Sequence, residues 1–268
     1  PASRRMERPG QSRGYSTSAC DMGVLRGSEV TQLGAGSVGS HLAYRLGPVG
    51  LRLNLLDSGI VKAKHTEHGR TIYDATQIGT KKVHAAKQKL EREFPGTKIN
   101  AYPYSTAEVP DSEFQSMFAS SLMVILVIDD GPEILRLAAL AYPITELIHA
   151  AMHRNGDSGH IVISVPCAAT PCLQCTLGIR QAADIRTLTS EPANSLDIIQ
   201  IAEYSARMAL DIAHSKVTGR RISRWDTSKN LIYITNTREE LSPDGPGVHY
   251  EASQRRPGCV VCNHRMPS

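Results

Sequence analysis

The chain has 268 residues, of which 41% are hydrophobic and 21% are charged, and its formal net charge at pH 7 is +4. A chain of this length can bury one large core, or one domain with a small extension, and so small a charge gives no argument for a nucleic-acid partner. Because the longest apolar run, LMVILVI at 122–128, is too short to span a membrane and the first residues lack the apolar core of a secretory signal, we expect a cytoplasmic protein.

The sequence begins at Pro1 rather than methionine, as a piece of a longer chain would. Residues 1–27, rich in arginine, serine and glycine, are expected to form a flexible or partner-dependent segment before one domain at 28–268. The hydrophobic pattern predicts strands at 30–33, 51–57, 98–104, 122–128, 160–165 and 230–235. It predicts helices at 41–47, 81–94, 111–119, 133–141, 144–153 and 195–216, with a polar, irregular stretch at 58–80. Strands that alternate with helices indicate an α/β fold with a doubly wound, Rossmann-like, mostly parallel sheet.

A glycine-rich loop joins the first predicted strand to the first helix. The sequence GAGSVG places Gly34, Gly36 and Gly39 there, where glycine permits a tight turn and lets a phosphate approach the backbone N–H groups of the helix. Asp57 ends the next strand, where a carboxylate can accept hydrogen bonds from a ribose diol. We expect a nucleotide site, although enzymes that use NAD, FAD, SAM or ATP all contain this unit. The alternative is a turn that only packs the helix against the sheet.

Charged residues near the same sheet edge favour phosphoryl chemistry over hydride transfer. Arg70, Lys81 and Lys82 follow the second strand, and the pair Asp129-Asp130 ends the buried strand at 122–128. In open α/β sheets, ligands bind at this edge. Cations there can neutralise a triphosphate, and a carboxylate can hold Mg²⁺. Each residue alone is weak support, since Asp130 could equally be the N-cap of the following helix.

Two CxxC pairs predict a metal site. They occur in PCLQC and PGCVVC and supply four of the six cysteines: Cys172, Cys175, Cys259 and Cys262. Four thiolates in two knuckles are what a closed, tetrahedral, structural Zn²⁺ site requires. The ion would attach a C-terminal extension to the domain. A redox role is less favoured, because neither pair follows the first strand of a thioredoxin-like unit.

Taken in order, these segments resemble the ubiquitin-activating-enzyme superfamily, which includes the bacterial ThiF and MoeB adenylyltransferases. The matching segments are VTQLGAGSVGSHLAYRLGPVGLRLNLLD, GRTIYDATQIGTKK, VILVIDD, PCLQC and RRPGCVVC, and together they cover about residues 28–262. The resemblance implies an adenylation domain that uses ATP and Mg²⁺ to activate a C-terminal carboxylate. The usual substrate is the Gly-Gly end of a ubiquitin-like or sulfur-carrier protein. The resemblance also implies a homodimer or pseudo-dimer and a downstream conjugation or sulfur-transfer protein.

The resemblance also implies roles for individual residues. The three glycines of the loop would line the phosphates, and Asp57 would bind the ribose. Arg70 and Lys82 would stabilise the triphosphate. Asp129 or Asp130 would hold Mg²⁺.

Several positions depart from the family pattern. Gly59 stands where the family usually has a second aspartate, and Glu67 stands where it usually has an asparagine three residues before the arginine. The spacing to that arginine is also longer than usual, so that His68 competes with Arg70 for the arginine's role. We favour Arg70, because histidine is a poorer permanent cation. The arginine that the family contributes across its dimer has only uncertain counterparts, among them Arg13.

Members that form a thioester carry a further cysteine after the first zinc knuckle. Between Cys175 and Cys259 this chain has none. Hydroxyl residues occupy roughly that segment and are expected to be ordinary loop residues: Thr187, Thr189 and Ser190. Of the two remaining cysteines, Cys20 and Cys167, the second ends a predicted strand and is expected to be buried. We therefore expect adenylation without a thioester.

Three alternatives remain open. In the first, the same fold activates a small molecule, a peptide terminus or a tRNA base. The altered loop suggests instead a catalytically degenerate nucleotide-binding scaffold, or the inactive half of a heterodimer. The third alternative is an NAD(P) oxidoreductase, which the glycine loop alone permits.

Overall fold

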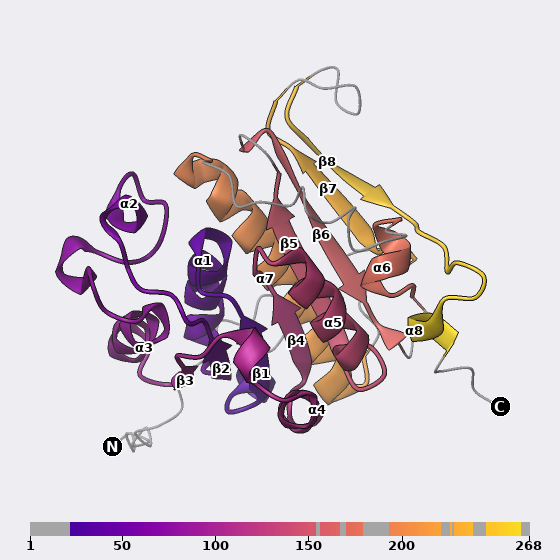
Figure 1. Ribbon diagram of the computed structural model, residues 1–268, viewed down its shortest axis with the longest axis horizontal. Coiled ribbons are helices and arrows are strands. Elements are labelled where there is room, and N and C mark those ends of the chain that lie inside the picture. The colour runs from indigo at the N-terminus through magenta and orange to yellow at the C-terminus, as the bar shows by residue number, and fades with distance from the viewer. Residues whose placement is uncertain are drawn as a thin grey trace, which may run out of the picture.

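The computed structural model describes residues 22–153, 156–166, 170–178, 193–220, 226, 228–237 and 245–263. Within these ranges one eight-stranded sheet runs through the molecule (Figure 1). Its strands are β1 Glu29–Leu33, β2 Arg52–Leu56, β3 Lys98–Tyr102, β4 Met123–Leu126, β5 Glu146–Met152, β6 Ser158–Ser164, β7 Leu231–Thr235 and β8 Gly247–Glu251. The α-helices are α1 Ser37–Leu46, α2 Ala63–Thr66, α3 Lys82–Glu93, α4 Asp111–Ser120, α5 Gly131–Ala141, α6 Leu173–Thr176, α7 Ser195–Thr218 and α8 Val260–Asn263. Short 3₁₀ helices are η1 Met22–Leu25, η2 Gly47–Val49, η3 Ala75–Gln77 and η4 Thr106–Glu108.

The strand order confirms the expected doubly wound sheet. From edge to edge it is β3-β2-β1-β4-β5-β6-β7-β8. The pairs from β3 to β5 are parallel, and β6, β7 and β8 continue the sheet antiparallel. From β1 the chain first adds β2 and β3 on one side of that strand. It then crosses over and adds β4 and the later strands on the other side of β1. Ligands of open α/β sheets bind outside the carboxyl ends of the strands at such a switch point.

Helices cover both faces of the sheet, as Figure 1 shows with α5 in front of the strands and α7 behind them. Successive side chains of a strand point to opposite faces, and β5 illustrates the result. Ile148 packs in the core that includes α1, α3 and α7, whereas Leu147 packs in the core under α4, α5 and α6. A strand buried on both faces is apolar in a continuous run.

This run explains why one predicted helix was wrong. Residues 144–153 were expected to form a helix, but Glu146–Met152 is the central strand β5. Apolar residues on both faces give no alternation, so periodicity cannot separate a buried strand from a buried helix. Strand β8, at the edge of the sheet, was expected to be loop because GVHYE has no apolar run.

The domain begins before residue 28. Leu25 of η1, in the segment expected to precede the domain, is fully buried in the core beside α1 and α7. Residues 1–21 lie outside the described ranges. In the described part of the chain, no helix has the length and apolar character needed to cross a bilayer.

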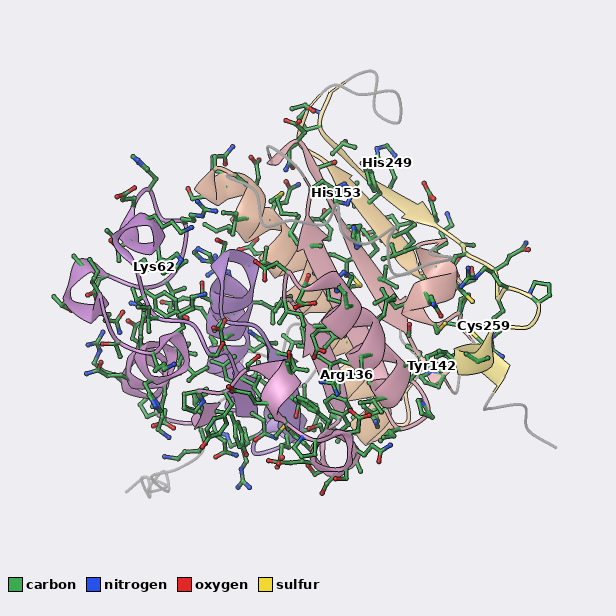
Figure 2. All side chains as sticks on the ribbon, viewed as in Figure 1. Lys62, Arg136, Tyr142, His153, His249 and Cys259 are labelled. Carbon is green, nitrogen blue, oxygen red and sulfur yellow. The ribbon has the colours of Figure 1, made fainter. Side chains whose placement is uncertain are left out.

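Three histidines lie next to one another at β5 and β6, and His153 is labelled in Figure 2. The ring of His160 lies 5.2 Å from that of His149 and 5.0 Å from that of His153, measured between centroids. His149 is fully buried, and its Nδ1 lies 3.1 Å from the Leu126 carbonyl oxygen. His160 is also buried, with its Nδ1 2.7 Å from Nε2 of His153. Burial lowers the pKa of His149 to about 4 and lowers that of His160 well below its usual value.

We expect the free energy of unfolding to fall as the pH is lowered from about 6.5 toward 4, because the unfolded chain binds protons there that the folded chain excludes. His149 alone should lower the free energy of unfolding by about 2 kcal/mol between pH 7 and pH 5. Urea unfolding at both pH values checks this, with His149→Gln as the matched variant. The variant should lose about that much of the pH dependence. Equal pH dependence in the two proteins would contradict the assignment.

Candidate functional site

A cavity of about 390 Å³ opens at the carboxyl ends of β1, β4 and β5. Residues that the sequence analysis assigned to nucleotide binding line it: Gly34, Gly36, Asp57, Arg70, Lys82 and Asp129. Gly39 and Asp130 do not line it. The structure therefore brings together, at the predicted edge of the sheet, residues that lie up to 95 positions apart (129 − 34).

The three glycines of the loop serve different purposes. Gly34 has φ +108°, and a Cβ there would lie 2.4 Å from the carbonyl oxygen of Val127. A Cβ on Gly39 would lie 2.3 Å from the Gly34 oxygen, so this glycine lets α1 pack against the loop. Gly36 meets nothing within 4 Å. Its missing side chain therefore leaves open space beside the start of α1, in the cavity wall.

Gln32, which the sequence analysis missed, holds this loop through hydrogen bonds from its side-chain amide. It lies fully buried on β1, and its Nε2 donates to the carbonyl oxygens of Gly34 at 2.9 Å and Gly39 at 2.8 Å. The Tyr73 hydroxyl donates to the Ala35 carbonyl oxygen at 2.8 Å. A glutamine in a strand expected at the centre of the sheet was the available signal. Buried amides are retained where they have specific partners.

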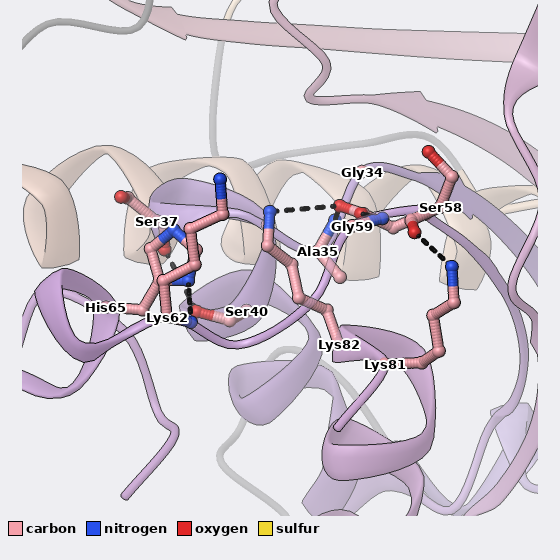
Figure 3. A network of polar contacts seen from close by, with 12 residues as sticks. Gly34, Ala35, Ser37, Ser40, Ser58, Gly59, Lys62, His65, Lys81 and Lys82 are labelled. Atoms are coloured by element: carbon pink, nitrogen blue, oxygen red, sulfur yellow. Dashed lines mark hydrogen bonds and ion pairs between the residues drawn. The ribbon is translucent and has the colours of Figure 1, made fainter. Parts of the chain in front are cut away.

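Asp57 is half-buried at the end of β2 and already has several partners. Its Oδ2 accepts from the Ala35 N–H at 2.8 Å, and its Oδ1 accepts from the Gly59 N–H at 2.7 Å. Lys82 Nζ lies 3.7 Å from Oδ2 (Figure 3). A Cβ on Gly59 would lie 2.8 Å from Asp57 Oδ1 and 3.0 Å from Lys82 Nζ. The departure at Gly59 thus makes room for the pairing of Asp57 with Lys82.

Arg70 lies on the cavity wall, where its Nε donates to the Ser37 hydroxyl at 3.3 Å. Glu67 and His68 are exposed and do not line the cavity. This placement favours Arg70 over His68 for the arginine's role, which stays a prediction. Lys81 points elsewhere, since its Nζ donates to the Ser58 carbonyl oxygen at 2.7 Å.

The basic segment before Arg70 adds cavity residues that the sequence analysis did not single out: Lys62, Lys64 and His65. His65 Nδ1 accepts from the Lys62 backbone N–H at 2.9 Å (Figure 3). Burial lowers the pKa of His65, and the nearby cations lower it further, beginning with Lys82 and Lys64. The run VKAKH was the visible signal, but a run of charge is usually a solvated surface.

The two aspartates after β4 separate in the structure. Asp130 is the N-cap of α5, where its Oδ1 accepts from the Glu133 N–H at 3.2 Å. Asp129 is exposed and lines the cavity. Mg²⁺ is usually held by one or two carboxylates together with phosphate oxygens and water. Asp129 fits that donor set, whereas Asp130 is occupied with the helix, as the sequence analysis allowed.

The four cysteines form a buried cluster away from the cavity, near Cys259 and Tyr142 in Figure 2. The four sulfurs lie within 4.8 Å of one another, with 3.7 Å between Cys172 and Cys259 and between Cys175 and Cys262. In a tetrahedral site with Zn–S bonds of about 2.3 Å, neighbouring sulfurs lie about 3.8 Å apart. The backbone N–H of Cys172 donates to the Cys262 sulfur at 3.4 Å, and the backbone N–H of Arg256 donates to the Cys175 sulfur at 3.3 Å. The donor set therefore fits one Zn²⁺ ion.

The model of the ThiF family matches residues 15–229 of this chain. The chain belongs to the ThiF family. Its fold is similar to crystal structures of E. coli MccB. The structure of that protein alone gives a TM-score of 0.71 at 15% identity, covering 92% of this chain and 68% of that one. The structure of MccB with ATP gives a TM-score of 0.68 at 15% identity, covering 90% of this chain and 68% of that one.

A curated relative is the uncharacterized protein y4qC of Sinorhizobium fredii (strain NBRC 101917 / NGR234). It is 39% identical over 84 residues, which are 30% of this chain. The matched stretch spans only 14% of that relative's length.

Several residues that the sequence analysis discussed in this ThiF-family chain lie outside the described ranges: Arg13, Cys20, Cys167, Thr187, Thr189 and Ser190.

Proposed function

We propose that this ThiF-family protein uses ATP to adenylate the C-terminal carboxylate of a peptide or of a ubiquitin-like or sulfur-carrier protein. The cavity at the switch point carries the proposal, because it gathers a glycine loop, a carboxylate for the ribose and cations for the phosphates. Family membership supports it. Crystal structures of MccB, which has the same fold, include complexes with ATP and with N-formylated MccA.

In the proposed reaction, an oxygen of the substrate carboxylate attacks the α-phosphorus of ATP. A bond forms between that oxygen and the phosphorus, the bond to the bridging oxygen breaks, and pyrophosphate leaves with the electron pair. A carboxylate needs no base, so catalysis depends on alignment and on stabilising charge at the phosphates. Lys82 and Arg70, which both line the cavity, would supply that positive charge.

Asp129 would hold Mg²⁺, which neutralises phosphate charge when it is bound. Asp57 would accept hydrogen bonds from the ribose hydroxyls. The cysteine cluster would hold a structural Zn²⁺ that fastens α8 to α6, and a closed site of four thiolates takes no part in the chemistry. The reaction would therefore end at the acyl-adenylate, to be used by a downstream protein. We expect a homodimer or pseudo-dimer.

The proposal is tested by the products. With ATP and a candidate substrate, the protein should release pyrophosphate and form an acyl-adenylate that hydroxylamine converts to a hydroxamate. The same substrate with an amidated C-terminus should give neither product. A hydroxamate formed equally from the amidated substrate would contradict activation of the terminal carboxylate.

Gly36→Ala should weaken ATP binding about tenfold or more, because the new methyl group occupies the open wall where phosphates approach the backbone. The free energy of unfolding should change by no more than about 1 kcal/mol. The matched variant is Gly39→Ala, which places a Cβ against backbone and should destabilise the fold by about 1–3 kcal/mol. Calorimetric titration with ATP and urea unfolding separate the two effects. A folded Gly36→Ala protein that binds ATP like the wild type would argue against phosphate binding at this loop.

A further inference from the structure

The ring of His65 is held in a defined orientation at the cavity. The residue is the third of α2, and its backbone carbonyl oxygen accepts from the Thr71 hydroxyl at 2.7 Å. Its Nδ1 accepts the backbone N–H of Lys62 at 2.9 Å. A nitrogen that accepts an N–H carries a lone pair, so the proton of the neutral ring is on Nε2. Nε2 is therefore the ring nitrogen left to meet a ligand, and it is a donor.

The surroundings of His65 disfavour protonation of the ring. Four cations line the same cavity: Lys62 and Lys64 on either side of the start of α2, Arg70 in the following segment, and Lys82 at the start of α3. Burial and these cations all lower the pKa of His65. A second proton would also have to displace the Lys62 N–H from Nδ1.

We propose that His65 contacts the substrate, with its neutral Nε2–H donating a hydrogen bond to an oxygen of the β- or γ-phosphate of ATP. This inference rests on the proposed function. A neutral donor gives direction to the polyphosphate without a further charge. In a cavity with four cations, another charge would hold the product pyrophosphate more tightly and slow its release.

The binding test uses two probes that do not react. One is the ATP analogue with a methylene group between the α- and β-phosphorus, and the other is AMP, which lacks the β- and γ-phosphates. His65→Ala should weaken binding of the ATP analogue about tenfold, as expected for a lost hydrogen bond to a charged group, and leave AMP binding unchanged. His65→Asn can both accept the Lys62 N–H and offer a neutral donor, and should stay close to the wild type.

Three results would overturn the inference: unchanged analogue binding in His65→Ala, equal losses for the analogue and AMP, or an asparagine variant as weak as the alanine variant. If His65→Ala does not fold, His65→Lys decides in its place. The added charge should lower kcat and the KM for ATP together, whereas unchanged values would count against the proposal. A wild-type protein that binds neither probe would contradict the proposed function itself.

The pH dependence separates a neutral donor from a cation. The ratio of analogue affinity between the wild type and His65→Asn should stay nearly constant between pH 8 and pH 7, because the pKa of His65 is lowered by burial and by the nearby cations and asparagine does not titrate. Because the nucleotide and the surrounding groups titrate in both proteins, their effects on the affinity cancel in the ratio. A ratio that rises as the pH falls would show that the ring binds as an imidazolium, which contradicts the proposal.

Discussion

Replacing Asp129 with alanine is expected to lower the rate of ATP–pyrophosphate exchange at least a hundredfold, since the loss of one preorganised charge-stabilising group typically costs that much. Asp129 lines the cavity at the end of β4, together with the glycine loop and the cations Arg70 and Lys82. Its carboxylate is exposed, so the substitution should leave the fold intact. The rate should depend less on Mg²⁺ concentration in the variant.

Asp130→Ala is the matched control, because it removes a neighbouring carboxylate with a different role. Loss of this N-cap should lower the free energy of unfolding by about 1 kcal/mol, and exchange should persist. Thermal unfolding and exchange, measured on both variants, give the comparison. If Asp129→Ala retains exchange, the proposal that Asp129 holds Mg²⁺ is contradicted. Loss of exchange in Asp130→Ala alone would move the metal assignment to the helix N-cap.

Loss of one zinc ligand is expected to have the largest effect on stability. Cys262 is almost fully buried, at 1% exposure, and belongs to the cluster that joins α8 to α6. Cys262→Ser should lower the free energy of unfolding by at least about 4 kcal/mol, because binding of a structural ion is coupled to folding. A strong chelator should produce a similar loss in the wild type.

Metal analysis should find one zinc ion per chain in the wild type and much less in Cys262→Ser. Cys20→Ser, which changes a cysteine outside the proposed ligand set, should keep both the zinc and the stability. A wild-type protein that is free of zinc, and is as stable after chelation as before, would refute the structural zinc site.

Sequence patterns predicted the parts of the fold in which one periodicity dominates. Helix α7 and the strands β1 and β2 lie close to where their apolar spacing puts them. β5 was missed because its side chains are buried on both faces, and a pattern of burial on both faces fits a strand or a helix equally well. β8 was missed because an edge strand needs no apolar run.

The candidate site was predictable where residue type and position agree. The glycine loop and Asp57 follow strands directly, so the switch point of the sheet brings them together. His65 was missed because it lies in the short helix α2, within a stretch that was expected to be polar and irregular. The structure instead leaves Glu67 exposed and puts His65 on the cavity wall. Gln32 was missed because only the fold shows which carbonyl groups its amide reaches.

Isotope exchange between pyrophosphate and ATP tests the central proposal most directly, since it reports reversible transfer of AMP from ATP, and an amidated control shows whether the acceptor is the terminal carboxylate. Candidate peptides and ubiquitin-like or sulfur-carrier proteins, each with a free and with an amidated C-terminus, would be assayed with labelled pyrophosphate. We predict that label enters ATP with a partner that has a free C-terminal carboxylate, and does not with its amidated form. ATP binding without exchange for any candidate would contradict this account and favour a catalytically degenerate nucleotide-binding protein.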